Sequence, residues 1–413
     1  MTGRWEQMGA ETGQAGRNPY RPGMGLEPPY LADRQYQLLR FTRFLDGFPD
    51  FPRNVRVTGL RGVGKTVLLQ RYAALAEDSG WVVVRRELGE NLQDELAFGL
   101  ALVEDCRQAI ERSSRRAEAR HRAESALHQT LEILGGISVS LAGVSISLKT
   151  PSSQSHRRPV LEDELFAALN TTCIGARSAG RRGVLLSYDE AHLLRDSSLA
   201  GRHSLSALLA AVARAQRERV PVMLILCGLP PLTENMARAK SYSERMFQAE
   251  VLDALRPPED GNAFIRPLAE SRRPFDPKLA EFVLADTRGY PFHIQFYGAL
   301  LWEAVPWPDA ITVEHFRRLR PALLEALDHA FFDARFARCS RFERRLLAAI
   351  ATDGEATDHR AVVQRLGVGH DLAKSAIGRL VSKGLIYRPE RGRLAFSVPM
   401  FGDYIRRKVR VDG

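Results

Sequence analysis

The sequence feature that most constrains the fold is a glycine-rich loop. Residues 59–66 read Gly-Leu-Arg-Gly-Val-Gly-Lys-Thr and fit the pattern G-x-x-x-x-G-K-[ST] without a mismatch. In this pattern backbone N–H groups curl around phosphate oxygens, Lys65 reaches the β- and γ-phosphates, and Thr66 places its hydroxyl on Mg²⁺. An apolar strand at 55–58 precedes the loop, and a helix at 65–77 follows it, so a helix N-terminus faces the phosphates. The loop therefore predicts a nucleotide-binding α/β fold.

A second apolar strand, 184–188, ends in a pair of carboxylates. Asp189 stands at the strand end, where it can hold Mg²⁺ through water, and Glu190 can orient and deprotonate an attacking water. The pair lies 123 residues after Thr66. The sequence thus predicts ATP and Mg²⁺ as cofactors, with Thr66 and Asp189 on the metal and Glu190 and Lys65 in catalysis.

Strand and helix signals alternate through the first two thirds of the chain. Further buried strands are expected at 81–85 and 222–227, and a helix at 92–110. This alternation favours a mostly parallel sheet with helices on both faces. After Pro257 the strand signals stop and helices dominate to about residue 336.

These signals divide the chain into four predicted parts. They are a flexible N-terminal arm at 1–29, a nucleotide-binding core at 30–255, a helical lid at 256–335 and a winged helix at 336–413. The segment 112–159 reads as an insertion in the core. Within it, apolar residues alternate with serines on both sides of Ala142-Gly143, which predicts a β-hairpin at 137–148.

The last region has the pattern of a winged helix-turn-helix. Helices are expected at 341–351, 359–366 and 371–382, followed by two short strands around the turn Arg391-Gly392. In such a domain the third helix lies in the major groove of duplex DNA and the wing contacts the backbone. The expected DNA-binding residues are Lys374, Ser375 and Arg379 on the third helix, and Arg388, Arg391 and Arg393 on the wing.

Charge placement supports an anionic partner for this region. The chain carries a net charge of +10, and fifteen Lys/Arg against eight Asp/Glu place +7 of it in residues 341–413. The alternative is that the winged helix docks protein or acts as an intramolecular lid. Aromatic stacking positions for single-stranded nucleic acid are not evident.

The order of these motifs resembles the AAA+ and STAND ATPases. The short motif Leu31-Ala32-Asp33-Arg34 is similar to one that sits against the adenine in these families, and Gly289-Tyr290-Pro291 is similar to their lid signature. Among relatives, the origin-recognition initiator group shares the layout of ATPase core, lid and winged helix. The resemblance covers about residues 31–410. It implies that the nucleotide is bound by Arg34, Gly59, Gly62, Val63, Gly64, Lys65, Thr66, Val67 and Pro291.

The sequence departs from these families in two places. Their third core strand usually ends near a polar sensor residue, whereas the strand here ends Leu226-Cys227-Gly228, and Arg288 is a poor match to a lid sensor arginine. Arg245 falls where AAA+ proteins often place an arginine that reaches the γ-phosphate of a neighbouring subunit. That role implies a homo-oligomer on ATP binding, and the alternative is an ordinary surface arginine.

Two functions follow from this reading. The first is an ATPase switch that couples nucleotide state to duplex DNA binding, and the second is a STAND-type signalling ATPase held inactive by its winged helix. A metabolic kinase has no use for the lid and the basic winged helix. The four cysteines show no metal-ligand or disulfide spacing, and no apolar run is long enough to cross a bilayer. We therefore expect a soluble, cytoplasmic protein with no membrane partner.

Overall fold

The computed structural model describes residues 16–48, 50, 52–115, 132, 134–138, 157–197, 202–354 and 356–411. The chain divides into two compact units. The sheet unit comprises Gln35–Gly59 and Leu68–Leu252, and the lid unit comprises Met1–Arg34, Leu60–Val67 and Asp253–Gly413. Each unit has its own apolar core.

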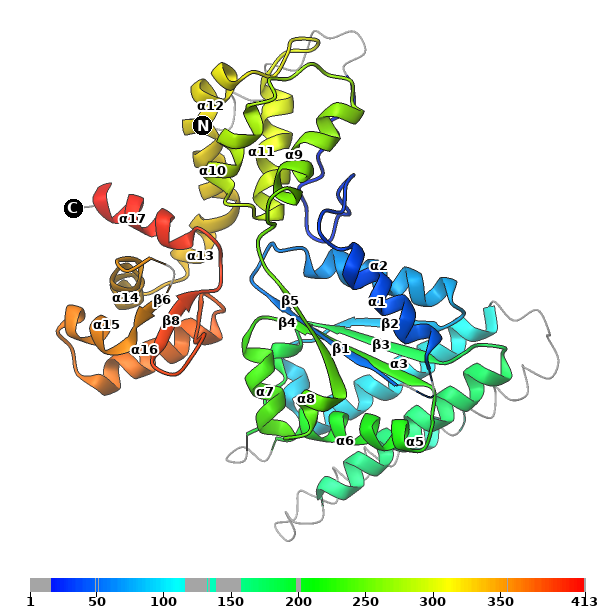
Figure 1. Cartoon of the computed structure of the whole chain (residues 1–413). Helices are drawn as coiled ribbons and strands as arrows, with labels where there is room; N and C mark the ends of the chain where they lie inside the picture. The colour runs from blue at the N-terminus through cyan, green and yellow to red at the C-terminus, as the bar shows by residue number, and fades with distance from the viewer. Residues whose placement is uncertain are drawn as a thin grey trace. The chain divides into compact units, whose positions relative to one another are not determined.

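The sheet unit is built on five parallel strands in the order β2-β3-β4-β1-β5 (Figure 1). The strands are β1 (Asn54–Gly59), β2 (Val82–Glu87), β3 (Val184–Asp189), β4 (Val222–Gly228) and β5 (Phe247–Leu252). The predicted α/β fold class is confirmed. Four of these strands were expected from their apolar runs, whereas β5, which pairs with β1 at the sheet edge, was not.

Helices cover both faces of this sheet, with α1 and α2 on one side and α5 and α6 on the other (Figure 1). The helices of this part are α1 (Gln35–Asp46), α2 (Lys65–Asp78), α3 (Glu95–Arg115), α5 (Arg157–Ser178), α6 (Ser204–Arg217), α7 (Pro231–Ala239) and α8 (Ser243–Met246). Alternate residues of β2, β3 and β4, such as Val84, Leu186 and Leu224, share one apolar core with α3, α5 and α6. On α1 and α2, Phe41 stacks on Tyr72 with ring centroids 4.2 Å apart.

The lid consists of helices, as predicted. They are α9 (Glu259–Glu270), α10 (Leu279–Thr287), α11 (Pro291–Ala304) and α12 (Val313–Leu327), with a π-helical turn (Asp328–Asp333) and α13 (Ala334–Ala337) after them. The flexible arm expected at 1–29 is wrong for its described part. Tyr20 is buried, its hydroxyl donates to the Phe264 carbonyl at 2.6 Å, and its ring lies against Gly298, where a Cβ would be only 2.4 Å away.

The C-terminal region has the element order of a winged helix. Its elements are α14 (Arg341–Ala351), β6 (Ala356–Asp358), α15 (His359–Leu366), α16 (His370–Ser382), β7 (Ile386–Tyr387), β8 (Arg393–Phe396) and α17 (Phe401–Val411). The strands form an antiparallel sheet in the order β6-β8-β7. The sequence did not predict β6 or α17. The sequence of the third helix predicts that Leu372, Ala376, Ile377 and Leu380 face inward. Leu372 is instead 52% exposed, and Ala373 is buried in its place.

The predicted insertion falls mostly outside the described residues. The hairpin expected at 137–148 is wrong at its start, because residues 134–138 are helical and the Ser138 hydroxyl donates to the Leu134 carbonyl four residues earlier. Residues 139–148 lie outside the described part of the chain.

Candidate functional site

The phosphate loop adopts the backbone that its glycines allow. Gly62 and Gly64 have φ of +83° and +89°, a region that residues with a side chain rarely occupy. Between them Val63 is fully buried. The Lys65 side chain is also largely buried, and its Nζ donates to the Leu60 carbonyl at 2.9 Å. The loop thus has the tight curvature that turns backbone N–H groups toward a phosphate.

Arg34 and the start of α11 both contact this loop within the lid unit. Arg34 is buried and donates from Nη2 to the Val63 carbonyl at 3.1 Å, while the Phe292 N–H donates to the Gly62 carbonyl at 3.2 Å. Pro291 is the first residue of α11, where its missing N–H costs nothing. The structure therefore brings Arg34 and the residue after Pro291 into contact with the phosphate loop.

The glycine of the lid signature has a clear steric cause. Gly289 has φ of +72°, and a Cβ there would lie 2.5 Å from the Leu255 carbonyl oxygen. The Leu255 N–H donates to the Gly289 carbonyl at 2.9 Å, which ties the segment before α9 to the start of α11. Any larger residue would break this contact.

The two predicted carboxylates stand at the carboxyl end of β3. Asp189 is its last residue, and its Oδ1 accepts the Glu190 N–H at 2.8 Å. Glu190 has φ of +54° and ψ of +26°, the left-handed region that a glutamate seldom adopts. Such a conformation costs roughly 1–3 kcal/mol, and strain of this kind is concentrated at functional sites.

Strand order places this end of β3 at the same sheet edge as the end of β1. All strands are parallel, and β4 alone separates β3 from β1. Because neighbouring strands lie about 4.8 Å apart, the ends at Asp189 and Gly59 are separated by roughly 10 Å. The phosphate loop continues directly from Gly59. A crevice outside the carboxyl ends of parallel strands is the usual place for a ligand in such sheets.

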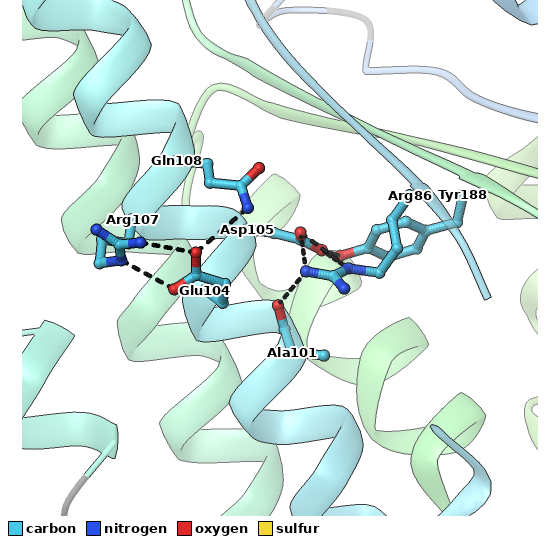
Figure 2. A network of polar contacts seen from close by, with 7 residues as sticks. All are labelled: Arg86, Ala101, Glu104, Asp105, Arg107, Gln108 and Tyr188. Carbon is cyan, nitrogen blue, oxygen red and sulfur yellow. Dashed lines mark hydrogen bonds and ion pairs between the residues drawn. The ribbon is translucent and has the colours of Figure 1, made fainter. Parts of the chain in front are cut away.

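A buried polar network supports β3 just before these carboxylates. Arg86 of β2 donates from Nε and Nη2 to Asp105 of α3 at 2.6–3.0 Å, and the Tyr188 hydroxyl donates to Asp105 Oδ2 at 2.8 Å (Figure 2). Burial raises the pKa of Asp105, and the hydrogen bonds from Arg86 and Tyr188 oppose this rise. The network ties α3 to the residue that precedes Asp189, so it fixes the strand that carries the predicted acids.

His192 is a site residue that the sequence reasoning missed. It lies in the turn after β3, with its Nδ1 3.3 Å from Glu190 Oε2. The available signal was the spacing Asp189-Glu190-Ala191-His192, which puts an imidazole two residues after the predicted base.

Arg245 lies near the amino ends of the strands, whereas the phosphate loop and Asp189 follow their carboxyl ends. It is exposed in α8, two residues before β5, and β5 pairs with β1 from Asn54 opposite Phe247 to Gly59 opposite Leu252. At about 3.3 Å per residue, Arg245 is roughly 20 Å along the sheet from Gly59. Arg245 therefore cannot reach a nucleotide at the end of β1 in its own chain, and a catalytic role would require a second copy.

The predicted DNA-binding residues separate into two groups. Lys374, Ser375, Arg388 and Arg391 are exposed. Arg379 is exposed too but is held by hydrogen bonds, because it donates to Ser375 Oγ at 2.9 Å and to the buried Glu343 at 3.2 Å. Arg393 is half-buried and donates to the Ala356 carbonyl at 3.0 Å. Arg393 thus joins β8 to β6 and does not stand on the exposed tip of the wing.

Two negative findings apply to the described residues. None of their helices combines the length and the apolarity that a membrane crossing needs. No cluster of three or more His, Cys, Asp or Glu side chains among them could hold a metal ion by itself.

Comparison with known proteins agrees with this geometry. Residues 30–226 match a family model described as an AAA ATPase domain, and residues 329–405 match one described as a domain of unknown function (DUF8462). No curated protein sequence matches the chain.

Several solved structures resemble the chain. The Walker-type ATPase Paby2304 of Pyrococcus abyssi matches with a TM-score of 0.51 and 16% identity, over 91% of this chain and 96% of that one. Two Aeropyrum pernix structures match with lower scores. They are the ORC1 protein in complex with DNA (TM-score 0.45, 15% identity, 93% and 94% covered) and the ORC2 protein with ADPNP and ADP (0.48, 14%, 94% and 98%).

The family match covers the phosphate loop, strands β1 to β3 and the acidic end of β3, and it ends within β4. The similarity to the Pyrococcus abyssi ATPase extends the same fold over most of the chain. Residues 30–226 therefore form an AAA ATPase domain, and the chain has the α/β P-loop fold that its sequence predicted.

Proposed function

We propose that this protein is an ATP-hydrolysing switch whose nucleotide state controls binding to duplex DNA. The observation that carries the proposal is the edge of the sheet where β1 and β3 end. There the phosphate loop follows Gly59, and a strained Glu190 follows Asp189. This is the donor set that phosphoryl transfer to water requires.

Each group in the proposed site has one role. Lys65 and the loop N–H groups bind the phosphates, and Thr66 and Asp189 hold Mg²⁺, which would neutralise charge on the phosphate oxygens. Glu190 orients the attacking water and takes its proton. Turnover is slow, because the end of β4 supplies no polar side chain at Cys227-Gly228 to sense the γ-phosphate.

The proposed DNA contacts lie in residues 336–413. Support comes from the +7 charge of residues 341–413 and from the exposed cations Lys374, Arg388 and Arg391. Helix α16 would enter the major groove, with Arg388 and Arg391 on the backbone. ATP binding would also assemble a homo-oligomer, in which Arg245 reaches the nucleotide of the neighbouring copy.

The experiment is a salt titration of the full chain on duplex DNA, with and without ATP. We expect affinity to fall steeply with salt, and the Arg388→Ala/Arg391→Ala variant to lower the log–log slope by about two units. A control with the same charge change is Arg107→Ala/Arg238→Ala, which removes two exposed arginines of the sheet unit. Equal slopes in both variants, or no duplex affinity at low salt, would overturn the DNA part of the proposal.

A second function has one observation in its favour. Within the lid unit the Arg61 N–H of the phosphate loop donates to the Ser397 carbonyl at 3.3 Å, and Arg288 at the end of α10 pairs with Asp403 of α17 at 2.8 Å. These contacts suit a STAND-type switch in which the C-terminal region restrains the loop until a protein partner arrives. In that case Asp403→Ala would accelerate nucleotide exchange without DNA, whereas the DNA switch predicts no such change.

A further inference from the structure

The end of β4 is shaped around the side chain of His192. Leu226 and Cys227 are fully buried, and no polar side chain projects from this strand end. At Gly228 a Cβ would lie 2.9 Å from the His192 backbone nitrogen and 3.0 Å from its Nδ1. A side chain at position 228 would therefore press on both the backbone and the imidazole of His192, so the glycine that leaves the strand end without a sensor is also the residue that admits His192.

His192 lies between Glu190 and the end of β4. Its Nδ1 is 3.3 Å from Glu190 Oε2, and the Leu229 N–H donates to the same nitrogen at 3.3 Å. The backbone is held separately, because Asn235 Nδ2 donates to the His192 carbonyl at 2.9 Å. One ring nitrogen thus faces both the predicted base and the strand end.

A single ring nitrogen serves these two neighbours one at a time. In the neutral tautomer with its proton on Nδ1, the ring donates to the Glu190 carboxylate. In the other tautomer, Nδ1 accepts the Leu229 N–H and leaves that carboxylate oxygen to bond water. The hydrogen bond made by the imidazole therefore decides whether this oxygen of Glu190 is bonded to His192 or is left to bond water.

We propose that His192 is a positioning residue for Glu190 and replaces the polar side chain that the end of β4 lacks. It links the strand end to the carboxylate that activates water. The inference rests on the proposed role of Glu190 in ATP hydrolysis. His192 acts through Glu190, so its removal changes the rate of the chemical step and leaves nucleotide affinity unchanged.

The test is a double-mutant cycle measured as steady-state ATP hydrolysis and as equilibrium nucleotide affinity of the full chain. His192→Leu removes the polar ring nitrogens but leaves a side chain of similar length, and we expect kcat to fall about tenfold or more. That loss is smaller than the 10²–10⁴-fold expected for Glu190→Gln. His192→Asn restores a polar atom at the Nδ1 position and should recover most of the rate. The double variant should be no slower than Glu190→Gln alone, because both changes remove one function.

A substitution at Gly228 is a second way to disturb the imidazole. Gly228→Ala should lower kcat at least as much as His192→Leu, because the added methyl would lie 2.9 Å from the His192 backbone nitrogen and 3.0 Å from its Nδ1 and would press on both. The matched control is Gly261→Ala in α9, where a Cβ meets no atom within 4 Å. If His192→Leu folds poorly, the comparison of Gly228→Ala with Gly261→Ala decides.

The outcomes separate this inference from the function it rests on. A normal kcat in His192→Leu, or losses that multiply in the double variant, would overturn the role of His192 and leave Glu190 as the base. Full turnover in Glu190→Gln would instead overturn the proposed hydrolytic site.

Discussion

Replacing the buried Glu343 with Gln tests what holds α16 in place. Glu343 of α14 is 1% exposed, and it accepts the Ser340 N–H at 2.8 Å, Lys383 Nζ at 2.7 Å and Arg379 Nε at 3.2 Å. Burial alone would raise the pKa of Glu343, but these hydrogen bonds hold it at about 2, below the ordinary 4.5. At 1.36 kcal/mol per pKa unit, the charged form contributes up to about 3 kcal/mol at neutral pH.

The sign of the pH dependence follows from the lowered pKa. The stabilisation is complete above the unfolded pKa of 4.5 and is lost as the pH falls through the folded value of about 2. Of the ~3 kcal/mol at pH 7, about 1.5 kcal/mol remains at pH 3. Glu343→Gln should therefore destabilise α14 and α16 by up to about 3 kcal/mol at pH 7 and by roughly half of that at pH 3.

Amide hydrogen exchange of the full chain measures this difference, because it reports the opening free energy of α14 and α16 separately from the rest of the molecule. Glu281→Gln on the exposed face of α10 serves as the control. A difference between parent and variant that is the same at pH 7 and pH 3, or that is below about 0.5 kcal/mol at pH 7, would refute this role of Glu343.

Three further predictions concern the sheet and the nucleotide. Lys65→Ala should abolish tight ATP binding in a calorimetric titration with Mg²⁺, and parental affinity would show that the phosphate-loop assignment is wrong. Tyr188→Phe removes one hydrogen bond to the buried Asp105, so urea unfolding should show a loss of about 1.5–3 kcal/mol; a loss near zero would mean that Arg86 alone satisfies the carboxylate. Mixing Arg245→Ala with Lys65→Ala should restore some ATPase activity if Arg245 acts across a subunit boundary, and no recovery at any ratio, with assembly verified by light scattering, would assign Arg245 to the surface.

Strands could be predicted where burial on both faces leaves a continuous apolar run. β3 and β4 are largely of this kind, and their predicted starts agree with the structure while each predicted end falls one residue short. β1, predicted before the phosphate loop, extends one residue further at each end. β5 was not predicted because Glu250 interrupts its apolar sequence. In the structure Glu250 is buried by an ion pair with Arg40 of α1, and such a partner cannot be recognised from the strand alone.

The other wrong or missing predictions concern residues whose environment depends on packing partners. Tyr20 has no periodic neighbours, and its burial depends on the opposed Gly298, about 280 residues later in the chain. In α16 the buried set Ala373, Ala376, Ile377 and Leu380 has regular helical spacing, and Leu372 attracted the prediction only because it is larger than Ala373. His192 was missed because its role depends on β4, which is adjacent to β3 in the sheet but more than thirty residues later in sequence.

The turn after β3 holds a glutamate in a backbone conformation that glutamate disfavours, and stability alone does not explain this choice of residue. Glycine would relieve the left-handed backbone at Glu190, which costs a glutamate roughly 1–3 kcal/mol. Three contacts fix the turn in spite of this cost: Asp189 Oδ1 accepts the Glu190 N–H, Asn235 binds the His192 carbonyl, and Gly228 makes room for the imidazole. They come from β3, from α7 and from the end of β4. A structure that holds a strained residue from three sides retains it for its side chain, and here that side chain is a carboxylate at the edge of the sheet where the phosphate loop begins.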